Sequence, residues 1–536
     1  MKRGNLRVLT LLVGAALLVI GASLLLLDGR VAYMQDDDSA RYVGAGDCGD
    51  CHRTLAGRHN GTAHDLALQN VQDNKEPILA DFSQGEDLRS ITINGATRAF
   101  TADDIAYAVG AGRRVQRYLF ATGEREYMVL PAEWNTQTNS WQALPLAPNW
   151  PDAAYDWDQN CAACHVTGFE PESGRWEDPG VQCEACHGPG SLHAEIADDI
   201  GGNPNDNELV EIRGSINIGI DPQVCGQCHA RGSDANNRPY PAGFVPGANL
   251  SAVFTLFPAD DSAHWYPSGH AQMPNMQYNE WLNAGHAQSL TNLVASGAAI
   301  DGDCLTCHSA DYVRTERLID AVRDEDREGD APEPLTAETA QYGVTCTSCH
   351  NPHSEGEQPV YLAQDSYTLC VSCHSDSSVA EGVHHPVREM FEGLPLLAEV
   401  PPLENAHFFA EDGPRCVTCH LPQVPTAAGP RASHALIPVL PGAALNVEGL
   451  TDTCSGCHAE AVEPALLQEL IDDIQNDTRQ RLEQARAAVS ADTPAWVTQA
   501  LDFVEGDGSL GIHNYAYTDA LLDAVFSALG LFGEGQ

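Results

Sequence analysis

The feature that most constrains this chain is a Cys-x-x-Cys-His unit that occurs nine times. All 18 cysteines of the 536-residue sequence belong to these units. In chain order the units are Cys48-Cys51-His52, Cys161-Cys164-His165, Cys183-Cys186-His187, Cys225-Cys228-His229, Cys304-Cys307-His308, Cys346-Cys349-His350, Cys370-Cys373-His374, Cys416-Cys419-His420 and Cys454-Cys457-His458.

The spacing of each unit is that of a c-type haem attachment site. Two thiols on one turn of chain reach the two vinyl groups of a haem, and the adjacent histidine becomes the proximal ligand of the iron. A disulfide framework would not need a histidine after every second cysteine. Structural zinc sites would need pairs of Cys-x-x-Cys to converge on one metal, again without that histidine. The sequence therefore predicts nine covalently bound haem c groups.

Twelve histidines lie outside the nine units, and a six-coordinate haem iron needs a second axial ligand. The predicted distal ligands are His64, His193, His270, His286, His353, His407, His434, His513 and one of His384 and His385, with His385 preferred. This set supplies nine ligands for nine haems, and His59 and His264 are left over. Met273 or Met276 could replace His270 and would raise the potential of that haem.

His193 follows the third motif after only five residues, Gly188 to Leu192. Glycine and proline in this stretch bend the chain, and so short a loop cannot carry His193 to the far face of its own haem. We therefore expect His193 to bind a neighbouring haem. His353 lies still closer to its motif, so the same expectation holds there.

A haem-pair module occurs twice. Gly180–Pro189 matches Gly343–Pro352, and each follows another motif and an upstream histidine. Duplication is the simpler account, and convergence on one local solution is the alternative.

We expect an anchor or signal at 1–29, haems one to four at 40–235, haems five to nine at 236–460 and C-terminal helices at 461–536.

The long gap between His52 and Cys161 carries alternating segments such as Ser90–Ile93 and Tyr127–Leu130, which are typical of strands. We expect a small β-containing insertion at about 85–147. After His458, apolar residues recur at helical spacing and predict long helices packed on haems or on another subunit. The predicted fold class is mainly α, packed around haems, with this β-containing insertion and long C-terminal helices.

The N-terminus predicts export. Lys2, Arg3 and Arg7 precede an uncharged run from Val8 to Leu27, which is long enough to span a bilayer with its basic end in the cytoplasm. We expect an uncleaved anchor holding the protein on the periplasmic side of the cytoplasmic membrane. A cleaved signal and secretion are the alternative.

The charge balance restricts the partners. Asp and Glu number 75 against 28 Lys and Arg, for a formal charge of −47, which argues against a nucleic-acid binder because phosphates would be repelled. Only Lys2 and Lys75 are lysines, a pattern that suits a halophilic source or a merely acidic exported protein. Partners with basic surfaces are expected, with attraction that weakens as salt rises.

Several of these segments resemble the multihaem cytochrome c superfamily. Residues 180–193 (GVQCEACHGPGSLH) and the stretch around Gln116–Leu119 are similar to the tetrahaem carriers related to hydroxylamine oxidoreductase. The segments CTSCHNPH at 346–353 and CVTCHLP at 416–422, with Gly511–Asn514, resemble larger relatives and the penta- and octahaem nitrite reductases. The resemblance implies a mostly helical fold, haems stacked in close pairs, and distal ligands at positions such as His193, His353 and His434.

Two functions remain open from the sequence. The first is electron transfer through bis-histidine haems, with redox proteins such as a membrane quinol-oxidising complex or other cytochromes as partners. The second is a reductase or oxidase of small nitrogen or sulfur compounds, which needs one open iron. The ligand count favours the carrier, so no catalytic residue is assigned. In nitrite reductases lysine often replaces the motif histidine, and all nine motifs here end in histidine.

Overall fold

A computed structural model describes residues 40–202, 204–324, 332–353, 361–376, 384–395, 397–458 and 462–532. The chain divides into two compact units, and each is described by itself below. The first comprises Met1–Val224 with Ala242–Leu250, and the second comprises Cys225–Pro241 with Ser251–Gln536. The fourth motif, which the sequence grouped with the first three, therefore lies in the second unit. The described residues are 41% helix and 12% strand, so the mainly α class holds at this coarse level.

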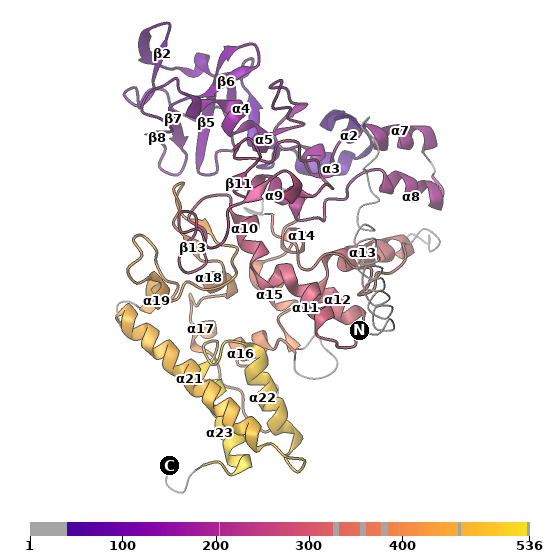
Figure 1. Cartoon of the computed structure of the whole chain (residues 1–536), viewed down its shortest axis with the longest axis vertical. Helices are drawn as coiled ribbons and strands as arrows, with labels where there is room; N and C mark the ends of the chain where they lie inside the picture. Colours follow the sequence, from indigo (N-terminus) through magenta and orange to yellow (C-terminus); the bar gives the residue numbers. More distant parts are fainter. Residues whose placement is uncertain are drawn as a thin grey trace, which may run out of the picture. The chain divides into compact units, whose positions relative to one another are not determined.

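The first unit contains an antiparallel sheet within the long gap between the first two motifs (Figure 1). Its strand order is β1-β4-β5-β7-β8, and β6 pairs with β5 beyond a bulge. The strands are β1 (Leu68–Asn70), β4 (Tyr107–Val109), β5 (Val115–Gly123), β6 (Glu126–Val129), β7 (Ala132–Asn135) and β8 (Ser140–Ala143). A separate hairpin joins β2 (Ser90–Ile93) to β3 (Ala96–Ala99) through Asn94 and Gly95. Both turn residues have positive φ, the conformation that a tight hairpin requires and that Asn-Gly adopts readily.

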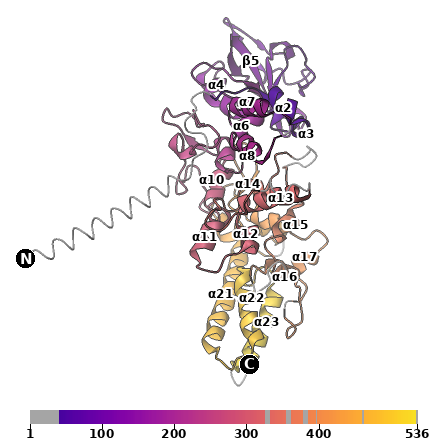
Figure 2. The same ribbon diagram turned by 90° about the vertical axis from the view of Figure 1, so that its right-hand side faces the viewer.

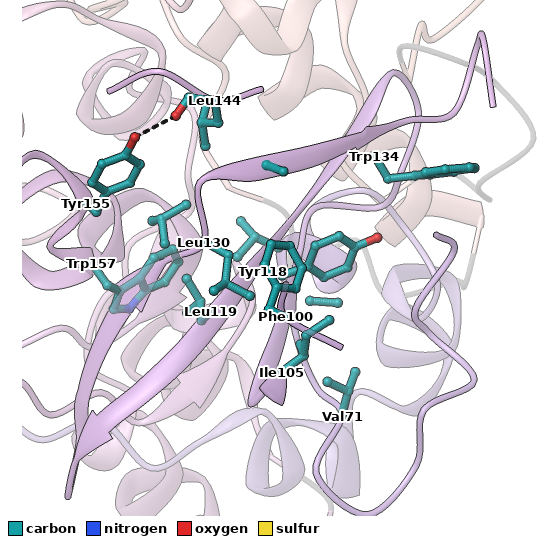
Figure 3. Packing of buried hydrophobic residues seen from close by; sticks show 14 of the residues in the cluster. Val71, Phe100, Ile105, Tyr118, Leu119, Leu130, Trp134, Leu144, Tyr155 and Trp157 are labelled. Atoms are coloured by element: carbon teal, nitrogen blue, oxygen red, sulfur yellow. Dashed lines mark hydrogen bonds between the residues drawn. The ribbon is translucent and has the colours of Figure 1, made fainter. Parts of the chain in front are cut away.

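The sheet has a side-chain core of its own (Figure 3). Tyr118, Leu119, Phe100 and Trp157 are completely buried there. The hydroxyl of Tyr155 donates to the carbonyl oxygen of Leu144 at 2.9 Å, which ties the segment after β8 back to the sheet. This part of the chain buries enough apolar surface without a prosthetic group, which explains why it forms ordinary β structure.

Short helices make up the rest of the first unit. They are α2 (Ala45–Cys51), α3 (Arg53–His59), α4 (Trp157–Asn160), α5 (Ala162–His165), α6 (Cys183–His187), α7 (Ser191–Ile200) and α8 (Asp206–Gly214). Two-residue strands β9 (Val166–Thr167) and β10 (Asp178–Pro179) pair between the second and third motifs.

The second unit is mostly helical. Its elements before the tail are α10 (Gln277–Leu282), α11 (Ser289–Ala295), α12 (Gly302–His308), α13 (Ala310–Asp324), α14 (Cys346–Cys349), α15 (Ser366–Val371), α16 (Val387–Glu392), α17 (Ala406–Phe409), α18 (Cys416–His420), α19 (Pro441–Ala444) and α20 (Ser455–His458). The helix α9 (Gln223–His229) carries the fourth motif, and the strand pairs β11 (Gly232–Ser233) with β12 (Thr255–Leu256) and β13 (Gln423–Val424) with β14 (Arg431–Ala432) complete the unit.

Three long helices end the chain: α21 (Pro464–Ala488), α22 (Ala495–Asp507) and α23 (Tyr515–Leu529). They lie side by side in both views (Figures 1 and 2). Phe503 and Tyr517 are fully buried between them, and Arg481 joins α21 to α23 through Asp519 at 2.6 Å and Asp523 at 2.5 Å. Pro494 is the N-cap residue of α22. The tail thus has its own apolar core.

Candidate haem sites

Each motif includes part of a short helix. The motif helices are four to seven residues long, and helices of this length are marginal in water without tertiary support. Eighteen free thiols are present and no two motif cysteines form a disulfide. The two thiols of each motif are thus unbridged, as attachment of one ligand to each motif requires.

The motif histidines meet other histidines at a separation that fits a shared iron. A metal–imidazole bond is about 2 Å long and each ring nitrogen lies about 1 Å from its ring centre, so two imidazoles on opposite faces of one iron have centroids about 6 Å apart. The ring of His52 lies 6.2 Å from that of His193, and the two planes differ by 17°. The other pairs at such distances are His350 with His434 at 6.2 Å, His420 with His513 at 6.1 Å, His374 with His286 at 5.9 Å and His458 with His407 at 5.9 Å.

These pairs join motif histidines to predicted distal ligands, one of each in every pair. In particular, His193 is paired with His52 of the first motif, a geometry that favours its predicted binding to a haem other than that of the third motif. The residues present therefore fit haem groups with two axial histidines. Such a group would supply one-electron chemistry at iron, and the histidines would hold it from both faces.

Hydrogen bonds orient the imidazoles for this role. The Nδ1 atoms of several motif and distal histidines lie next to backbone carbonyl oxygens, namely His165 with Ala67 at 3.1 Å, His187 with Asn217 at 2.6 Å, His193 with Ile212 at 2.9 Å, His308 with Ser289 at 3.2 Å, His420 with Leu436 at 3.0 Å and His434 with Ala432 at 3.2 Å. A carbonyl oxygen accepts the proton of Nδ1, which leaves the Nε2 lone pair for a metal. The fold thereby sets both the tautomer and the ring direction.

Burial keeps several of these rings neutral. It lowers the pKa of His374, His385 and His434 to about 4, with a smaller contribution from neighbouring histidines. A neutral imidazole is the form that binds iron, because a protonated ring has no free lone pair. These three rings are therefore ready to act as ligands at neutral pH.

His308 has two neighbours that could complete its haem. The rings of His384 and His385 lie 6.2 Å and 6.0 Å from it, and the ligand atoms of all three histidines fall within 4.8 Å of one another. His385 also lies 5.9 Å from His374 and has a φ of 51°. The choice between His384 and His385 thus stays open.

His270 does not fit the predicted ligand role. It is completely buried, its Nδ1 lies 2.9 Å from the Ser268 hydroxyl, and its Nε2 lies 3.1 Å from the carbonyl oxygen of Ile437. Both ring nitrogens are engaged by the protein, an arrangement that does not favour His270 as an iron ligand. His64 and His353, both half-buried, remain predicted ligands.

The two leftover histidines also have protein partners. His59 Nε2 lies 3.0 Å from the carbonyl oxygen of Val181. His264 stacks on Phe257 with ring centroids 3.7 Å apart, and its Nδ1 lies 2.8 Å from Asp261. Met276 is buried in an apolar cluster with Trp265. Nothing in these contacts favours His59, His264 or Met276 as an iron ligand.

Buried glutamates hold the ligand-bearing segments in place, and the sequence analysis missed them. Glu184, inside the third motif, accepts from the backbone amides of Val43 at 3.0 Å, Gly44 at 2.8 Å and Gly190 at 2.7 Å. These bonds fasten the segment before the first motif to the third one. A carboxylate beside two cysteines gives no sequence signal of this role, because Val43 and Gly44 lie about 140 residues away.

A second glutamate acts in the same way in the other unit. Glu280 on α10 accepts from the Ser433 hydroxyl and from the backbone amide of His434, both at 2.6 Å. It also accepts from the backbone amide of Ala271 at 2.9 Å. The position of His434 opposite His350 therefore depends on a residue more than 150 positions earlier in the chain.

Cysteines of different motifs touch. The sulfur atoms of Cys48 and Cys183 lie side by side in the first unit, and those of Cys307 and Cys373 and of Cys370 and Cys416 do so in the second. The seventh motif, with Cys370 and Cys373, thus contacts both the fifth and the eighth. Cys349 of the sixth motif also lies close enough to interact with Cys373.

Comparison with known proteins identifies two matching protein families over parts of the chain. Residues 133–188 match cytochrome c554 and c-prime, and residues 339–379 match the doubled CXXCH motif. No curated protein sequence shows a significant match.

Two solved structures are similar over most of the chain. The outer cell wall cytochrome OcwA has a TM-score of 0.72 and 28% identity, and the match covers 91% of this chain and 99% of that one. The undecahaem cytochrome from the S-layer of Carboxydothermus ferrireducens has a TM-score of 0.56 and 22% identity, with 93% and 71% coverage. With the motifs and the family matches, these findings define the class: the chain is a multihaem c-type cytochrome that binds haem covalently.

The predicted localisation is wrong and needs correction. In the part of the chain that the structure describes, we find no helix with the length and apolar character needed to cross a bilayer, and the predicted anchor at Val8–Leu27 lies outside that part. The similar structures are those of outer cell wall and S-layer cytochromes. An apolar N-terminal run is common to anchors and export signals. The length of this run therefore does not establish that the protein is anchored in the membrane on the periplasmic side.

Proposed function

We propose that this protein is a nonahaem cytochrome that transfers electrons through closely spaced bis-histidine haems. The observation that carries the proposal is the contact between cysteines of different motifs. Each motif cysteine marks an edge of its haem, because the thioether bond joins the two directly. Where the sulfur atoms of two separate motifs lie side by side, the two haem edges come together.

In the second unit these contacts suggest a path. Cys307 meets Cys373, and Cys370 meets Cys416, so electrons pass from the fifth haem to the seventh and on to the eighth. Cys419 of the eighth motif interacts in turn with Cys457 of the ninth. The seventh haem is then the junction of the unit, and the ninth is an end of the path.

The paired histidines favour a carrier over an enzyme. An iron held by two imidazoles has no position open to substrate, and the described histidine pairs would close the coordination of the haems that they hold. The similarity to an outer cell wall cytochrome over nearly the whole chain leads us to propose that this protein also works outside the cell membrane. Its partners there are redox proteins or acceptors with positive charge, since the chain is strongly acidic.

Flash reduction tests the path. We expect a single electron introduced into the wild-type protein to redistribute among the haems at a rate independent of protein concentration. The double variant Cys370→Ser, Cys373→Ser lacks the junction haem, and redistribution should then depend on concentration because it needs collisions. The matched control, Cys454→Ser with Cys457→Ser, removes the end haem and should keep the concentration-independent phase.

Two results would contradict the proposal. The first is a junction variant that redistributes electrons as the wild type does. The second is a fully reduced wild-type protein that binds one equivalent of carbon monoxide, because that would reveal an open iron and favour a reductase or oxidase of small molecules.

A further inference from the structure

His513 differs from the six motif and distal histidines described above in what its Nδ1 atom meets. The six described above face backbone carbonyl oxygens, whereas His513 Nδ1 lies 2.6 Å from the Oδ1 atom of Asp507. The ring of His513 lies 6.1 Å from that of His420 in the eighth motif. On the other side of the same iron position, His420 has the ordinary neutral partner, the carbonyl oxygen of Leu436.

The carboxylate is held in a built environment. Asp507 is the last residue of α22, and its side chain is 1% exposed. The backbone amide of Ser509 donates to its Oδ2 at 3.2 Å, and the Ser509 hydroxyl donates to the same atom. That hydroxyl also accepts from the backbone amide of His513 at 3.0 Å. Gly508, in the left-handed region with a φ of 73°, lets the chain turn so that these groups converge.

This position is costly for a negative charge. The C-terminal end of a helix carries partial negative charge, which disfavours a carboxylate, and burial removes the water that would solvate it. The donors from Ser509 and His513 offset that cost. A carboxylate that stays buried despite the helix dipole and the loss of water has a partner that benefits from its charge. Among the described contacts of Asp507, the one ring is the imidazole of His513.

We propose that Asp507 lowers the reduction potential of the haem held by His420 and His513. A carboxylate accepts the Nδ1 proton more strongly than a carbonyl oxygen does, which raises the basicity of Nε2 as an iron ligand. The more basic ligand and the nearby negative charge both stabilise ferric over ferrous iron. Asp507 is thus a positioning and tuning residue that acts through His513.

The position of the eighth haem in the proposed path determines how Asp507 affects electron flow. Cys416 of the eighth motif contacts Cys370 of the seventh, and this inference rests on the proposed path through those two haems. A lowered potential at the eighth haem creates an energy step between the junction haem and the ninth. Asp507 therefore regulates how readily electrons pass toward that end.

A redox titration followed by visible and EPR spectra tests the proposal on the full-length holoprotein. Asp507→Asn keeps the size and an acceptor oxygen for Nδ1 but removes the charge. We expect one of the titrating components to move to higher potential, one set of low-spin g values to shift, and the haem count to stay the same. Asp502→Asn is the matched control: Asp502 lies on the same helix, half exposed and paired with Arg486 at 2.5 Å, and its loss should move no component.

A second variant changes the sign of the effect. Ser509→Ala removes a hydroxyl donor from Asp507, so the carboxylate interacts more strongly with His513. One component should then move to lower potential. Unchanged components in both Asp507→Asn and Ser509→Ala would overturn the proposal, and so would a high-spin iron in Asp507→Asn, since that would show a purely structural role. Either of these results would overturn the role of Asp507 alone if the wild-type protein still redistributes electrons independently of concentration. Failure of the proposed path would instead appear in the flash-reduction experiment.

Discussion

At the scale of single residues, the histidines outside the motifs divide by what surrounds their ring nitrogens. A ring whose Nδ1 is bonded to the protein and whose centroid lies 6.2 Å from that of another imidazole is placed for iron, as in His193 and His434. A ring with both nitrogens bonded to the protein, as in His270, has no lone pair to offer. Sequence counting treats all of these residues alike, because the partners are distant in the chain.

The pairing of His193 with His52 leads to a residue-scale prediction. His193→Ala should retain the wild-type number of covalent haems in a pyridine haemochrome assay, because the thioether bonds are untouched. It should also create one high-spin iron by EPR, since one axial ligand is lost. The control His264→Ala should create none, because His264 contacts Phe257 and Asp261 instead.

Removal of the first haem locates the effect. In His193→Ala combined with Cys48→Ser and Cys51→Ser, the high-spin signal should disappear together with that haem. Persistence of the signal would mean that His193 serves another haem, and the assignment to His52 would be lost.

At the scale of elements, the chain builds two kinds of structure. The sheet β1–β8 and the tail helices α21–α23 bury aromatic and aliphatic side chains in ordinary cores. The motif helices are too short to be stable alone, and their support comes from long-range bonds such as those of Glu184 and Glu280 together with the haems they carry. Strands β2–β8 lie within the predicted insertion, whose alternating pattern the sequence displays directly.

The tail provides an element-scale prediction. Phe503→Ala removes a fully buried ring between α22 and α23, and loss of a buried aromatic side chain costs about 3–5 kcal/mol of unfolding free energy. We expect the denaturant midpoint of the far-UV circular dichroism transition to fall accordingly. The control is Leu466→Ala on α21, where Leu466 is 56% exposed. This variant should change the free energy of unfolding by less than about 0.5 kcal/mol. Equal effects of the two variants would show that the tail has no packed core.

At the scale of the whole molecule, charge governs encounters. The formal charge of −47 is increased further by haem propionates. Oppositely charged partners are then steered to the protein at low salt, and the attraction is screened within about 10 Å at 0.1 M ionic strength.

Stopped-flow reduction checks this expectation. A cationic reductant should react faster than an anionic one of similar potential at low ionic strength, and the two rates should converge as salt is added. A neutral reductant serves as the control and should show little dependence on salt. Rates that are independent of reagent charge at low salt would remove the electrostatic argument for positively charged partners.

The sequence alone determined the chemistry of the protein. Haem attachment needs only residues that are neighbours in the chain, so nine Cys-x-x-Cys-His units identify the cofactor before any fold is known. The amphipathic tail and the alternating strands are likewise local patterns. The pairing of imidazole rings, by contrast, brings together residues such as His52 and His193 across more than 100 positions.

Only the tertiary structure decided which imidazoles face each other, which histidine is structural, and which carboxylate meets a ligand. His270 and His434 look equivalent in the sequence, and they differ because Ile437 and Ser268 engage both nitrogens of the first while Glu280 positions the second. Asp507 carries no motif at all, and it acquires its role when the turn at Gly508 brings it to His513. Ligand geometry depends on where distant segments pack, and that information is not contained in any local pattern of the chain.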